Sequence, residues 1–86
     1  MNADVKKEIK EIIETMTTAR LSLAESHKKL IDIVTDEEEA IDELPNQDSD
    51  SALARREKMD ELREAVDQLE DLVTILEDDV LGKIEV

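Results

Sequence analysis

The residues in this chain that could bind a metal or transfer a proton are a single histidine, His27, and 25 carboxylates. In helical bundles a metal-binding histidine typically follows a glutamate by three residues, and a catalytic histidine needs a partner that orients its ring. Residue 24 is an alanine, and the chain has no second histidine and no cysteine. We therefore predict that His27 lies at the edge of a helix interface and is neither a metal ligand nor a general base.

Carboxylates are densest between Asp36 and Glu43. Together with a second group later in the chain, they loosely resemble the paired acidic motifs with which all-helical nucleotide pyrophosphatases bind magnesium. The residues concerned are Glu38, Glu39, Asp42, Glu64 and Asp67. In a helical hairpin, Glu64 lies about eight residues, or roughly 12 Å of helix, from the level of Glu39, so the two groups do not converge. The sequence predicts no metal site and no cofactor.

Nucleophilic and phosphate-binding chemistry also lack their usual residues. Hydroxyls are present at Thr17, Thr18, Ser22 and Ser26, but no histidine–aspartate pair is placed to activate them. The single glycine excludes a glycine-rich phosphate loop. We predict a protein that is not an enzyme and has no catalytic residues.

Charge and composition restrict the partners. Eleven basic residues against 25 acidic ones give a net charge of −14, and the chain has no aromatic residue. Direct binding to nucleic acid or to an anionic membrane is therefore disfavoured. Apolar runs never exceed three residues, too few to span a membrane, and the lysines near the N-terminus precede no apolar stretch of a signal peptide. We expect a cytoplasmic protein, in the producing or host cell.

The elements that carry these residues are two amphipathic helices in one domain, 1–86. Pro45 ends the first, and the pattern predicts a helix over 4–44, a turn over 45–50, a helix over 51–81 and a tail over 82–86. The first apolar seam contains two consecutive steps of four at Ala19, Leu23 and His27, which predicts a stutter. Thr35 with Glu38 resembles a capping box, but a continuous helix is the preferred interpretation.

The second helix has a regular heptad seam, and Gly82 is the predicted stop, in the left-handed conformation. Its seam residues are Met59, Leu62, Val66, Leu69, Val73, Leu76 and Val80. The predicted fold is all-α, an antiparallel two-helix hairpin with coiled-coil packing. Folding at the turn brings the acidic end of the first helix, Glu37–Glu43, level with Arg55, Arg56 and Lys58, so each cluster faces opposite charge.

Two helices cannot cover two wide apolar stripes, and the first helix extends past the second. We therefore predict a homodimer that forms a four-helix bundle. The apolar residues predicted to form the dimer or partner interface are Val5, Ile9, Ile12, Ile13, Met16, Leu72 and Ile75.

The predicted function is a non-enzymatic protein–protein interaction module, a small acidic adaptor or structural protein that binds a basic or apolar partner surface. One alternative is a phage- or plasmid-encoded nucleic-acid mimic, of the anti-CRISPR or anti-restriction type, that inhibits a host nucleic-acid-binding enzyme. Another is a helical secretion or assembly chaperone. The acidic surface predicted to face the partner consists of Asp36, Glu37, Glu38, Glu39, Asp42, Glu43, Asp67, Glu70, Asp71, Glu77, Asp78 and Asp79.

Overall fold

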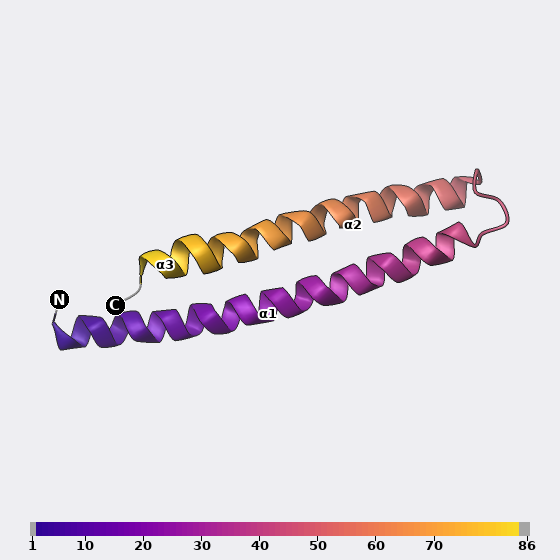
Figure 1. Ribbon diagram of the computed structural model, residues 1–86. Helices are drawn as coiled ribbons and strands as arrows, with labels where there is room; N and C mark the ends of the chain where they lie inside the picture. The colour runs from indigo at the N-terminus through magenta and orange to yellow at the C-terminus, as the bar shows by residue number, and fades with distance from the viewer. Residues whose placement is uncertain (1, 85–86) are drawn as a thin grey trace.

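The computed structural model describes residues 2–84 and shows two long helices that run antiparallel from a single turn (Figure 1). Helix α1 spans Ala3–Asp42 without a break at Thr35, and α2 spans Asp50–Thr74. A π-helix, η1, follows over Ile75–Val80, and α3 over Leu81–Lys83 completes the second arm. The predicted all-α hairpin is confirmed, and the first turns of α1 extend beyond the end of α3.

Side-chain caps begin both helices. The Asn2 side chain accepts a hydrogen bond from the Val5 amide, 2.9 Å away, and the Ser49 hydroxyl accepts one from the Ala52 amide at 3.1 Å. Each bond satisfies a backbone amide that has no partner within its helix. Asparagine and serine are among the residues preferred at the N-cap of a helix.

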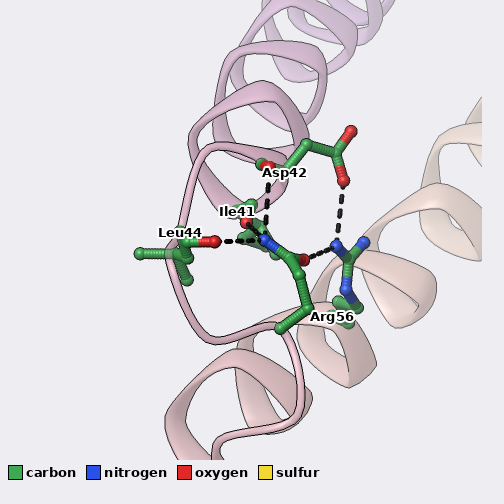
Figure 2. Close-up of polar contacts among 5 residues, drawn as sticks. Ile41, Asp42, Leu44 and Arg56 are labelled. Atoms are coloured by element: carbon green, nitrogen blue, oxygen red, sulfur yellow. Dashed lines mark hydrogen bonds and ion pairs between the residues drawn. The ribbon is translucent and has the colours of Figure 1, made fainter.

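A glutamine side chain closes the C-terminal end of α1. The Gln47 amide nitrogen lies 2.8 Å from the Ile41 carbonyl oxygen, 3.2 Å from that of Asp42 and 2.7 Å from that of Leu44. The Ile41 carbonyl also accepts from the Leu44 backbone amide at 3.1 Å. The Gln47 amide thus adds a donor at Ile41 and supplies one to the Asp42 and Leu44 carbonyls, which lie at and beyond the end of the helix. Arg56 donates to the Gln47 side-chain oxygen and, at 2.9 Å, to the Asp42 carboxylate, which ties the turn to α2 (Figure 2).

The interface face of α1 keeps a seven-residue period throughout, which corrects the predicted stutter. Its central row consists of buried or half-buried residues at alternating steps of four and three: Ile9, Ile13, Met16, Arg20, Leu23, His27, Leu30, Val34, Glu37 and Ile41. Leu44 continues the row just after the helix, and Thr17, Ala24 and Glu38 are half-buried beside it. Ala19, assigned to the seam by its apolar character, is exposed, and Arg20 occupies that place. A long aliphatic stem allows arginine to line an interface while its charged end reaches solvent or a partner.

The second arm changes its helical phase near its end. In η1 the amide of Leu81 donates to the carbonyl of Leu76, five residues earlier. This wider winding accommodates one additional residue, and it leaves Lys83 exposed and Ile84 half-buried. A regular α-helix would have placed Lys83 in the seam. The prediction for Gly82 is wrong, because it lies within α3 and its φ is not positive.

Burial is concentrated near the turn. The buried residues among those described are Val34 and Ile41 of α1 and Ala52 and Val66 of α2. The molecule measures 67 × 15 × 14 Å, with a radius of gyration of 19.5 Å, against about 12 Å for a compact chain of this length. The turn half of the hairpin thus contains all of its buried core, and the open half contributes only half-buried contacts.

Candidate interaction surfaces

Ion pairs join the two helices along one flank of the seam. Arg56, Arg63 and Glu77 lie seven residues apart or in multiples of seven, so they share one row of the second arm. Arg63 Nε lies 2.6 Å from Glu38 Oε1, as an ion pair without hydrogen-bond alignment, and Glu77 lies 3.7 Å from the Arg20 guanidinium. Together with the Arg56–Asp42 pair, they form what we call the charged flank.

The predicted facing of the acidic and basic clusters at the turn is confirmed. Arg55 Nε donates to Glu37 Oε1 at 2.8 Å across the seam, and the two side chains are 37% and 34% exposed. Lys58 instead pairs within its own helix, with Glu61 at 3.6 Å. Partial burial makes the Arg55–Glu37 pair the least solvent-screened ion pair of the hairpin.

These pairs divide the predicted acidic surface into two groups. Glu37, Glu38, Asp42 and Glu77 contact arginines within the hairpin. The other predicted residues are exposed, and within residues 2–84 they form no ion pair: Asp36, Glu39, Glu43, Asp67, Glu70, Asp71, Asp78 and Asp79. Only the second group remains available to a partner without breaking an internal contact.

The structure also extends the acidic surface of α2. Six exposed carboxylates follow one another on the side of the second arm that faces away from α1, at steps of three and four except where Thr74 interrupts. We call this the outer acidic row: Glu57, Asp60, Glu64, Asp67, Asp71 and Asp78. Steps of 3.5 residues place consecutive carboxylates about 5 Å apart along the axis. The prediction missed Glu57, Asp60 and Glu64, although their heptad spacing was visible in the sequence.

The flank opposite the ion pairs is apolar and uncovered. On α1 it is a row with a strict seven-residue period. On the second arm it comprises Ala65 and Leu72, which lie between Lys58 and Asp79 in the matching row, and Ile75 of the neighbouring row. We call it the apolar flank: Val5, Ile12, Ala19, Ser26, Ile33, Ala40, Ala65, Leu72 and Ile75. Its large side chains are strongly exposed, with 53% of Ile12, 59% of Ile33 and 52% of Leu72 accessible.

The predicted interface residues are divided between the exposed apolar flank and the seam that joins the two helices. Val5, Ile12, Leu72 and Ile75 belong to the exposed apolar flank. Ile9, Ile13 and Met16 are half-buried in the seam between the helices. The structure therefore leaves the first four available to another molecule and places the other three partly within the hairpin itself.

A shallow groove lies over the N-terminal part of α1. It has a volume of about 440 Å³, is open to solvent, and is lined by Glu8, Glu11, Ile12, Thr15 and Met16. Two glutamates and two apolar side chains give it a mixed character, and it is continuous with the apolar flank through Ile12.

The candidate metal residues do not converge. Within residues 2–84 no group of three or more histidine, aspartate or glutamate side chains is arranged to hold a metal ion. His27 is half-buried in the seam, and its Nε2 is buried without a hydrogen-bond partner. None of the helices described is long and apolar enough to cross a membrane.

The chain matches no protein-family model, no curated protein and no solved structure. Its function must therefore be inferred from the surfaces described above.

Proposed function

We propose that this protein is a non-enzymatic protein–protein interaction module, a homodimer that binds the basic surface of a partner protein. The observation that carries the proposal is the outer acidic row, in which six carboxylates without ion pairs lie along one side of the second arm.

The energetics of the row support binding to a basic surface. Like charges three or four residues apart destabilise a helix by a few tenths of a kcal/mol per pair. Asp67 and Asp71, for example, stand in this relation on α2, and neither has a basic partner among the residues described. A surface rich in lysine or arginine would relieve this repulsion, and the field of the row would increase the rate of association.

Neutralisation of the row tests the proposal. A variant with Glu64→Gln, Asp67→Asn and Asp71→Asn would be compared with wild type for binding to a lysine-rich polypeptide over a salt series. Wild-type affinity should fall steeply with salt, and the variant should bind at least tenfold more weakly. Circular dichroism checks that both remain helical.

The matched control removes the same number of charges elsewhere on exposed positions of α1. Its substitutions are Glu11→Gln, Glu14→Gln and Glu25→Gln. This control should retain most of the wild-type affinity. Equal losses in both variants would show that net charge, and not the outer acidic row, determines binding, and would contradict the proposal.

A second candidate function is inhibition of a nucleic-acid-binding enzyme. The regular spacing of the outer acidic row along a rigid helix favours it, because evenly spaced carboxylates can occupy a groove that binds phosphates. Displacement of a labelled DNA duplex from a basic DNA-binding protein would support this function. Tight binding to basic proteins without any displacement of DNA would contradict it.

A further inference from the structure

We propose that a second copy of this chain docks antiparallel on the apolar flank, with α1 of one hairpin against α1 of the other and the two-fold axis near Ala19. This inference rests on the homodimer of the proposed function and specifies its interface and register. The occupant is a second copy for three reasons. The excess exposed area is close to that of a protein–protein interface, and the residue sizes and the charges of the flank complement those of the same flank in an antiparallel copy.

The hairpin exposes more surface than a folded chain of its size should. Its accessible area is 6471 Å², whereas a monomer of 9.8 kDa should expose about 5,200 Å². A standard protein–protein interface covers roughly 800 Å² on each partner. One such interface would therefore remove most of the excess area.

The open half of the hairpin contains none of the buried residues among those described. The buried residues among those described all lie toward the turn, whereas exposed apolar side chains line the flank in both halves, with Val5, Ile12, Leu72 and Ile75 farther out and Ile33 nearer the turn. A partner on the open half would complete a core that the turn half already has. This position also leaves the turn, with its ion pairs, free of the interface.

A two-fold axis near Ala19 would pair residues of complementary size along the flank of α1. Val5 and Ile33 lie at equal distances from it in sequence, as do Ile12 and Ser26. An antiparallel copy with its two-fold axis near Ala19 would bring Val5 against Ile33 and the large Ile12 against the small Ser26. Alanine at the centre permits the two α1 helices to approach closely, as small residues do at helix crossings.

Charges at the rim favour the same orientation. Glu8 and Lys29 lie almost equally far from Ala19, on the same side of α1, so the antiparallel arrangement places Glu8 level with Lys29 of the second copy. Lys29 contacts only Glu25 in the single hairpin, at 3.2 Å, and is 71% exposed. A parallel dimer would instead pair each charge with its own copy, which is repulsive.

Asp79 opposes this arrangement, so its removal should strengthen the dimer. Asp79 belongs to the row of Ala65 and Leu72. It lies near the level of Ala19, because Glu77, two residues before it, contacts Arg20, so its two copies would approach each other near the two-fold axis. Asp79→Ala should tighten the dimer severalfold. Asp78→Ala, one residue away on the outer acidic row, should change the dimer affinity much less.

The absence of cysteine makes crosslinking a direct experiment. Ala19→Cys should yield a covalent dimer on oxidation or with a short bismaleimide, because its two copies lie at the two-fold axis. Ala40→Cys, in the same exposed row of α1, should remain monomeric under the same conditions, since it lies far from the axis. Circular dichroism verifies that both variants fold.

The outcomes separate this inference from the proposed function. Crosslinking at residue 19 but not 40 supports the register. A dimer by light scattering that crosslinks at neither position, or preferentially at residue 40, overturns the register and leaves the homodimer intact. A monomer at every concentration overturns both this interface and the homodimer, whereas binding of the lysine-rich polypeptide tests the outer acidic row independently.

Discussion

Replacement of Ile41 by alanine should remove much of the stability of the hairpin. Ile41 is fully buried between α1 and the start of α2, with 0% of its surface accessible. The substitution removes three carbons, worth about 0.8 kcal/mol each, and leaves a cavity that adds to the loss. We expect the free energy of unfolding to fall by about 3 kcal/mol, a large share of the roughly 5–15 kcal/mol of a small protein.

Urea unfolding followed by circular dichroism measures this loss. With a denaturant dependence of about 1 kcal/mol per molar urea, the midpoint should shift by about 2–3 M. The control is Leu21→Ala, at a position on α1 that is 55% exposed, which should shift the midpoint by less than about 0.5 M. Equal shifts for the two variants, measured at the same protein concentration, would mean that the buried core is not centred at Ile41.

Three further experiments test the polar contacts. Gln47→Ala should lower the free energy of unfolding by about 1–2 kcal/mol in urea titrations, because the carbonyls at the end of α1 lose their shared donor; an unchanged midpoint would mean that water replaces it without loss. His27→Leu should raise the melting temperature, because the buried Nε2 has no partner, and a lower melting temperature would reveal a role for the ring. A double-mutant cycle on Glu37 and Arg55 should give a coupling of about 1 kcal/mol, and a value near zero would show that this half-buried pair contributes no more than a solvated one.

The architecture followed from features that act locally and strongly. Pro45 cannot continue a helix, and the alternating apolar steps on either side of it require two amphipathic helices. The opposite charges of Glu37 and Arg55 then select the hairpin, since only that topology brings the ends of both helices level. The proline, the apolar period and the opposite charges could each be read from the sequence, because none of them depends on how the side chains pack.

The sequence did not show every residue of each helix that lies in the seam. Apolar character favoured Ala19 over Arg20, but the interface accepts an arginine whose stem packs and whose guanidinium reaches Glu77. The π-helix leaves Lys83 exposed and Ile84 half-buried. The preference for Ile84 over Lys83 at the interface arises from the packing of the two arms and not from the local sequence. Local propensity contains no information about either choice.

The interaction surfaces were predicted only in part for a related reason. Sequence reasoning grouped carboxylates by proximity along the chain and so missed the heptad row that begins at Glu57. It also counted Glu38 as free to meet a partner, whereas Arg63 lies 2.6 Å from it in the hairpin. Whether a surface charge is available depends on what the opposite helix places beside it.

The most direct test of the account is size exclusion coupled to light scattering, at low and high salt and over a range of protein concentrations. Burial of an apolar flank predicts a dimer at both salt concentrations, and a tighter one at high salt because screening weakens the repulsion between two chains of charge −14. A monomer under all these conditions would contradict the central claim that the apolar flank drives self-association and leaves the acidic faces free for a partner.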